Sequence, residues 1–273
     1  MGVPDFGRHQ ANCFWSAHKG LSEGVGHIVT SWAVRHNHPE TGYPATFAAV
    51  LAARGVEGFD SGALCREWAL ETFGVALPDF AVAIALAAEG LRPAENRDRV
   101  YGRAGVWAKR LRALQNDEDL LDADIQSLCG EHGGPAKTRA QIVRARREFA
   151  RAALLFRCCQ RRAKRNAHRF EFWLEGIALQ DFYLDFLHAA MVRRLPREAA
   201  RLDRRARHLM ARTRALFART YPAFSVEQEV LARYGYHLEY LSRILALHRR
   251  GTGRVGCRVG RHPRGKPIAK VIL

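Results

Sequence analysis

The feature that most constrains the fold is a row of apolar residues spaced by seven along residues 142–191. Its members are Ile142, Phe149, Phe156, Ala163, Phe170, Ile177, Leu184 and Met191. A strand repeats every two residues and does not hold such a row, whereas a helix holds it as one continuous stripe. The spacing predicts a long helical segment over residues 137–194, with Gly176 as its kink or break.

Two more striped segments follow. Leucines recur at seven-residue intervals at positions 195, 202, 209 and 216. Pro196 suits the first turn of this helix, and Tyr221 and Pro222 end it. A capping-box pattern starts another helix at Ser225, which runs to Arg250. Burying one Leu or Phe contributes roughly 1.5–3 kcal/mol, so these stripes need partners. Short connections between long striped helices predict an antiparallel hairpin or bundle, with the arginines outward and the 142–191 stripe as its spine.

The part before this bundle carries short helical patterns with Gly or Pro at the joints. The predicted helices cover residues 45–54, 63–73 with Asp60 or Ser61 as cap, 78–89, 93–114 in one or two pieces, and 117–129. The fold class is therefore all-α. We predict a helical domain over 1–135, a basic bundle over 136–250 and a basic Gly-rich tail over 251–273. A hairpin turning at 263–265 and a disordered tail are the alternatives for the tail.

The net charge of +17 is distributed unevenly. Residues 1–136 hold 12 Lys or Arg and 17 Asp or Glu, whereas residues 137–273 hold 32 and 10. Nearly all of the base is arginine, which pairs with phosphate through two parallel hydrogen bonds and stacks on bases. This asymmetry predicts a polyanion-binding half and a mildly acidic half that serves folding or contacts with other protein subunits.

The arginines cluster off the apolar stripes, and few acids stand near enough on the same helix to neutralise them: Glu148, Glu198 and Asp203. We therefore predict binding to the phosphate backbone of DNA or RNA, without base-specific reading. The alternatives for these arginines are a solvated face or a face docked on the acidic half. The predicted nucleic-acid-binding residues are Arg144, Arg147, Arg151, Arg161, Arg162, Arg165, Arg169, Arg201, Arg204, Arg205, Arg254, Arg258, Arg261 and Arg264.

Other motifs give weaker signals. Residues 47–55 and 60–73 have the lengths of a helix-turn-helix, but the second helix is net negative, which favours two packed core helices. The pairs His36/His38 and Cys129/His132 have zinc-ligand spacing without a second pair. Asp185, His188, Glu171 and Glu175 lack the repeated signature of a di-iron bundle. We predict no metal and no cofactor, and the role of His18, His27, His36 and His38 is unexplained.

Arg243 and His248 are separated by four residues in the last predicted long helix. This pair resembles the short Arg/His motif of the HEPN ribonuclease families, although Ile244 replaces the polar residue that usually follows the Arg. The resemblance implies His248 as acid/base and Arg243 as phosphate binder. A HEPN-like or metal-dependent nuclease is therefore the enzymatic alternative to a non-enzymatic binding protein, and a helical protein-interaction scaffold is the second alternative.

No run of about 18 apolar residues predicts a membrane span, and the first ten residues lack the pattern of a signal peptide. The six cysteines are scattered, which is typical of free thiols in a reducing compartment. These features predict a cytoplasmic, nucleic-acid-binding subunit or factor.

Overall fold

The structure, a computed structural model, describes residues 6–25, 43–89, 129–130, 133–192, 194–220 and 246. Every regular element in these ranges is a helix, which confirms the all-α prediction. The predicted helices over 93–114, 117–129 and 225–250 and the tail over 251–273 lie outside the described residues, apart from residues 129 and 246.

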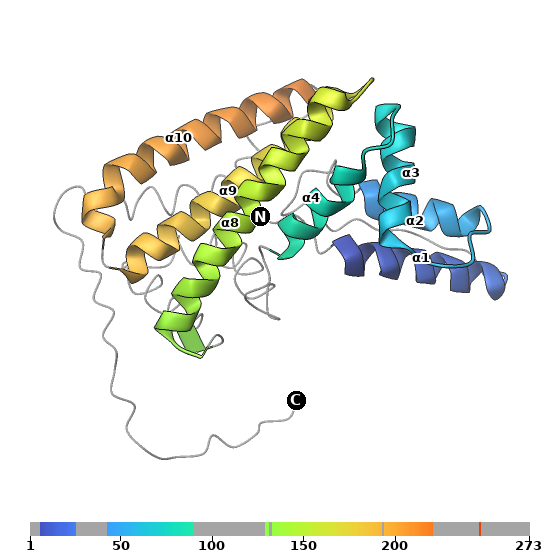
Figure 1. The fold of residues 1–273 in the computed structure, drawn as a ribbon, viewed down its shortest axis with the longest axis horizontal. Helices are drawn as coiled ribbons and strands as arrows, with labels where there is room; N and C mark the ends of the chain where they lie inside the picture. Colours follow the sequence, from blue (N-terminus) through green and yellow to red (C-terminus); the bar gives the residue numbers. More distant parts are fainter. Residues whose placement is uncertain are drawn as a thin grey trace, which may run out of the picture.

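The first four described helices form one side of the molecule (Figure 1). They are α1 (Phe6–Ser22), α2 (Tyr43–Ala53), α3 (Ser61–Phe73) and α4 (Pro78–Glu89). The last three match the predicted helices closely, whereas α1 was not predicted. At the start of α3 the Asp60 carboxylate accepts hydrogen bonds from the backbone N–H groups of residues 62 and 63, at 2.7 and 3.1 Å.

The long apolar stripe folds back on itself. Its two halves lie in α8 (Pro135–Arg162) and α9 (Phe170–Met191), which are joined by a turn and the short helix η3 (Ala167–Arg169). The prediction that Gly176 breaks the helix is wrong, because Gly176 lies inside α9. The break falls where Ala163 leaves the helix in an extended conformation and Asn166 adopts a left-handed one, with φ 56°.

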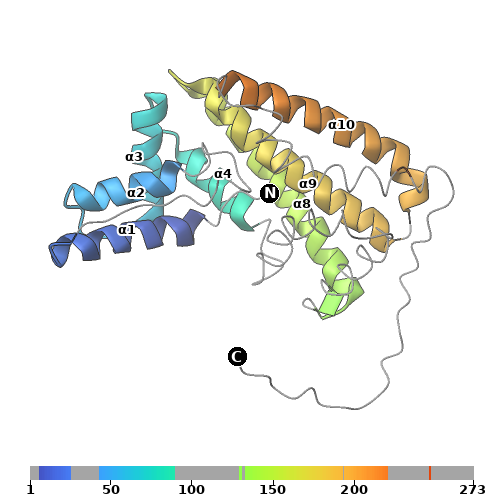
Figure 2. The same ribbon diagram turned by 180° about the vertical axis from the view of Figure 1, so that it is seen from behind.

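The three long helices run up, down and up, with α9 between α8 and α10 (Leu195–Thr220), as Figures 1 and 2 show. Stripe residues of α8 and α9 are buried against each other, and Phe156 lies 5.4 Å from Trp173 between ring centroids. The leucines of α10 at positions 195, 202, 209 and 216 are also buried. The predicted antiparallel hairpin or bundle of long helices is therefore present in the described residues.

An aromatic cluster joins the short helices to the long ones. It consists of Trp68, Phe73, Phe80, Phe156, Phe170 and Trp173, all of them buried. The rings of Phe73 and Phe170 stack at 4.3 Å, and those of Phe80 and Phe156 meet edge to face at 5.9 Å. Because these rings come from α3, α4, α8 and α9, one continuous core spans residue 135, where the sequence predicts a domain boundary.

The turn between α8 and α9 also caps the end of α3. The carbonyl of Phe73 accepts hydrogen bonds from the backbone N–H groups of Lys164 and Arg165, at 3.0 and 3.1 Å. The side-chain amide of Asn166 donates to the carbonyl of Thr72 at 2.8 Å. The last carbonyls of a helix have no partner within it, so the turn satisfies acceptors that the helix itself leaves unpaired. This docking explains why the stripe turns at this point.

Asn166 tests the role of this turn in stability. Asn166→Gly should lower the unfolding free energy by about 1 kcal/mol, because it removes the hydrogen bond to Thr72 and keeps the left-handed conformation. Asn166→Ala should cost about 2 kcal/mol, because alanine also disfavours that conformation. Urea denaturation measures both values, and equal losses for the two variants would contradict the assigned backbone geometry.

Candidate nucleic-acid interface

The three long helices differ sharply in charge. The α8 segment holds nine Lys or Arg and one acid, and the α10 segment holds eight Arg and two acids. The α9 segment between them holds four Asp or Glu and no Lys or Arg, and most of its residues are buried. A buried carboxylate is costly unless a cation or a hydrogen-bond donor pairs with it. The arrangement therefore places arginines on both sides of an acidic helix.

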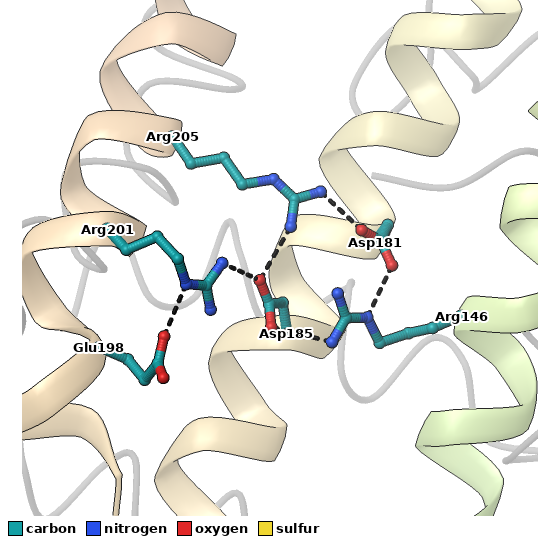
Figure 3. A network of polar contacts seen from close by, with 6 residues as sticks. All are labelled: Arg146, Asp181, Asp185, Glu198, Arg201 and Arg205. Carbon is teal, nitrogen blue, oxygen red and sulfur yellow. Dashed lines mark hydrogen bonds and ion pairs between the residues drawn. The ribbon is translucent and has the colours of Figure 1, made fainter.

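The centre of this arrangement is a network of ion pairs that ties the three helices together (Figure 3). From α8, Arg146 donates to Asp181 at 2.8 Å and to Asp185 at 2.9 Å. From α10, Arg205 donates to the same two aspartates at 2.6 and 2.9 Å. Arg201 adds a third guanidinium at 2.8 Å from Asp185. Two carboxylates of α9 are thus shared among three arginines that neighbouring helices supply.

The partners of the α9 carboxylates determine the direction of their pKa shifts. Burial by itself raises the pKa of Asp185, but Arg201, Arg146 and Arg205 together outweigh it, so the pKa of this carboxyl is lowered. Near the other end of α9, Glu175 accepts a hydrogen bond from the Thr213 hydroxyl at 2.9 Å and lies 3.0 Å from Arg212. Burial raises the pKa of Glu175 in spite of these two partners. The surroundings of Asp185 therefore stabilise a charged carboxylate, whereas the surroundings of Glu175 disfavour one.

These contacts divide the predicted phosphate-binding arginines into groups. Arg201 and Arg205 contact carboxylates of α9, which sequence spacing could not reveal because Asp185 is 16 and 20 residues away from them. Sequence spacing identifies ion pairs only between residues three or four apart on one helix, so it cannot show pairs between different helices. Arg146, which the sequence prediction omitted, belongs to the same network.

A second group lies against the short N-terminal helices. Arg162 pairs with Asp79 at 3.4 Å, and the Arg165 guanidinium donates to the carbonyl of Glu71. The Arg169 guanidinium lies over the rings of Tyr43 and Trp68, at 5.3 and 5.9 Å from their centroids. For these three residues the structure favours the alternative of a face docked on the acidic half. Arg161 lies beside them, with Cys158 Sγ at 3.2 Å.

A third group projects from the outer face of α8, opposite the buried stripe. Arg144, Arg147 and Arg151 are exposed there. Arg151 has a partner on its own helix, Glu148 at 3.3 Å, and keeps 67% of its side chain in solvent. Within the described ranges, Arg144 and Arg147 have no carboxylate within 4.0 Å, nor has the exposed Arg204 on α10. We call Arg144, Arg147 and Arg151 the outer row.

A groove of about 590 Å³ lies beside the outer row, between α8 and α9. Its floor is apolar, formed by Val143, Phe149, Ala150, Ala153, Leu174, Ile177 and Ala178. Its charged lining is Arg146, Arg147 and Arg157 from α8, Asp181 from α9 and Arg212 from α10. Arg147 belongs to both features, so the groove and the outer row are continuous. Sequence reasoning missed Arg157, because no local pattern sets it apart from the other arginines.

The other motifs have different outcomes. Arg243, His248, the tail arginines 254, 258, 261 and 264, and the histidines at 27, 36, 38 and 132 lie outside the described residues. His18 stacks on Phe14 at 6.2 Å on α1. Within the described part of the chain no three His, Cys, Asp or Glu side chains are grouped for a metal. The α9 carboxylates of the di-iron alternative are held by arginines instead.

The helix-turn-helix candidate is part of the core. In α3, Leu64, Cys65 and Trp68 are buried, while Glu67 and Glu71 are exposed. This leaves an acidic outer face on α3, as the sequence predicts for two packed core helices.

A scan against protein-family models, a search of curated proteins and a search of solved structures each found no match to this chain. No single helix in the described ranges has the length and apolar composition to cross a membrane. Helices α3 and α4 have that length and composition only when they are taken together, and they are bent by 115° relative to each other.

Asp185 tests the ion-pair network. Asp185→Asn should lower the unfolding free energy at neutral pH by about 2–3 kcal/mol, because three guanidinium groups lose a shared counter-charge. The loss should stay below that of a fully buried pair because Arg201 remains 46% exposed. The matched control is Glu148→Gln, which removes a pair within α8 whose arginine is 67% exposed, and it should cost less than about 1 kcal/mol. Urea denaturation measures both.

Acidification provides a second control for the same variant. A carboxyl with a lowered pKa in the folded protein contributes stability above its unfolded pKa of about 3.9 and loses it as the pH falls through the folded value. The difference in unfolding free energy between wild type and Asp185→Asn should therefore be at its maximum at pH 7 and shrink below about pH 4. A difference that is independent of pH would show that packing, and not charge, accounts for the loss.

Proposed function

We propose that this protein binds the phosphate backbone of nucleic acid through the outer face of α8. The observation that carries the proposal is the division of the arginines. Arg146, Arg201 and Arg205 pair with carboxylates of α9, whereas Arg144 and Arg147 face outward without a carboxylate within 4.0 Å in the described residues. Cations that serve the fold are thus distinct from cations that are available to a partner.

The charge that remains after pairing is large. Residues 135–220 contain 22 Lys or Arg and seven Asp or Glu. Even if every acid neutralises one cation, fifteen positive charges remain on this part of the chain. Such a surface repels itself, and release of the counter-ions condensed on a polyanion makes nucleic acid a favourable partner.

The length of α8 also suits an extended ligand. Between Arg144 and Arg151 the helix rises about 10 Å. Each strand of a duplex carries one phosphate per roughly 3.4 Å of axis, so the outer row runs beside about three phosphates per strand. Contacts from arginines on one helical face to phosphates position a ligand without reading its sequence.

A salt titration with arginine variants tests the proposal. At about 50 mM salt the chain should bind DNA or RNA, and the logarithm of the binding constant should fall linearly with that of the salt concentration. Arg144→Gln and Arg147→Gln should each reduce the slope by about 0.9 on duplex DNA, because one phosphate contact is lost.

The matched control is Arg205→Gln, which removes the same charge from the network with α9. It should lower the unfolding free energy and leave the salt slope of the folded protein unchanged. Absence of binding at low salt would reject the proposed function. Equal slope changes for Arg205→Gln and Arg144→Gln would reject the division of the arginines.

A further inference from the structure

We infer that the groove between α8 and α9 takes unpaired bases, so that the preferred ligand is single-stranded nucleic acid. The inference rests on the proposed function and specifies the ligand of the same surface. Its starting observation is contiguity, because Arg147 belongs both to the outer row and to the lining of the groove. A strand whose phosphates follow the outer row therefore has its bases next to an apolar floor.

The composition of the groove matches a nucleotide. Its volume of about 590 Å³ falls within the range of small-molecule sites. The floor offers Leu174, Ala150, Ala153 and Ala178 to a flat apolar surface, and Val143 at its edge is 37% exposed. Guanidinium groups stack on base faces, and Arg157 lies at the rim without a carboxylate within 4.0 Å in the described residues. Apolar floor and cationic rim together suit a base and its phosphate.

A duplex does not use this groove. Its bases are stacked and paired inside the double helix, so only phosphates and sugars reach a surface of this kind. The apolar floor would then remain in water, and binding would gain nothing from it. In a single strand the bases are accessible, and covering roughly 40 Å² of the apolar floor with a base should raise affinity about fivefold. The groove thus favours the single strand over the duplex.

The same geometry indicates tolerance of base identity. Among the described residues, Asp181 is the one carboxylate in the lining, and its two oxygens accept hydrogen bonds from Arg146 and Arg205, at 2.8 and 2.6 Å. These two contacts take about half of the acceptor sites of this carboxylate, which weakens its capacity to distinguish base edges. An acidic amphipathic helix of a partner protein would also match a cationic rim. The excess of base along the whole of α8, beyond the groove, favours a longer polyanion.

The test compares a labelled oligothymidylate of about 20 nucleotides with a duplex of the same length, by fluorescence anisotropy on the full chain at about 50 mM salt. Wild type should bind the single strand at least about fivefold more tightly. The variant Ala150→Leu/Ala153→Leu, which fills the floor, should lose that preference and keep its affinity for the duplex. Ala53→Leu, an exposed substitution on α2 outside the groove and the outer row, should behave as wild type.

Each outcome separates the two proposals. Equal affinity of wild type for both ligands, or an unchanged preference in the filled variant, would overturn the inference and leave phosphate binding intact. Displacement of the single strand by a synthetic Leu/Glu amphipathic peptide at lower concentrations than by unlabelled oligothymidylate would assign the groove to a protein partner and also overturn it. A thermal melt and retained duplex binding show that the filled variant is folded. If the wild-type protein binds neither the single strand nor the duplex, the proposed function itself is rejected.

Discussion

A buried helix with four carboxylates is stable only if its neighbours bring cations to it, because an unpaired buried charge costs several kcal/mol. In this protein the requirement falls on α9, and arginines of α8 and α10 meet it. Arg146 reaches Asp181 and Asp185 from one side, and Arg201 and Arg205 reach them from the other. The order of the three helices follows from this need, since α9 satisfies its charges only between two basic partners.

The same requirement organises the surface. Arginines that pair with α9 lie along the seams of the bundle, and those that contact the short helices support the docking of the α8–α9 turn on α3. The arginines without a carboxylate within 4.0 Å in the described residues include Arg144, Arg147 and Arg157 on α8 and Arg204 on α10, and Arg147 and Arg157 border a groove whose floor is apolar. The proposed binding of nucleic acid uses the cations that the fold leaves unpaired, so stability and function draw on different residues of one type.

The sequence predicted the all-α class, the helices over 45–54, 63–73 and 78–89 and the burial of the seven-residue stripes, because these depend on local spacing and caps. It did not predict the fold-back at residues 163–166. The seven-residue row continues through Ala163, and the turn contains no Gly or Pro to mark it; Asn166 supplies the left-handed conformation instead. The partners of Arg146 were also invisible, because Asp181 and Asp185 stand 35 and 39 residues away along the chain. Long-range pairing is a property of the packed bundle, so it required the structure.

Arginine-selective modification with a dicarbonyl reagent, followed by peptide mass spectrometry, tests the division of the arginines most directly. In the free protein Arg144, Arg147 and Arg204 should react fast, and Arg146 and Arg205 should react slowly because carboxylates of α9 hold them. Single-stranded oligonucleotide at low salt should protect Arg144 and Arg147 and leave the slow residues unchanged. Equal reactivity of Arg146 and Arg144 in the free protein, or no protection of α8 by the oligonucleotide, would contradict the account.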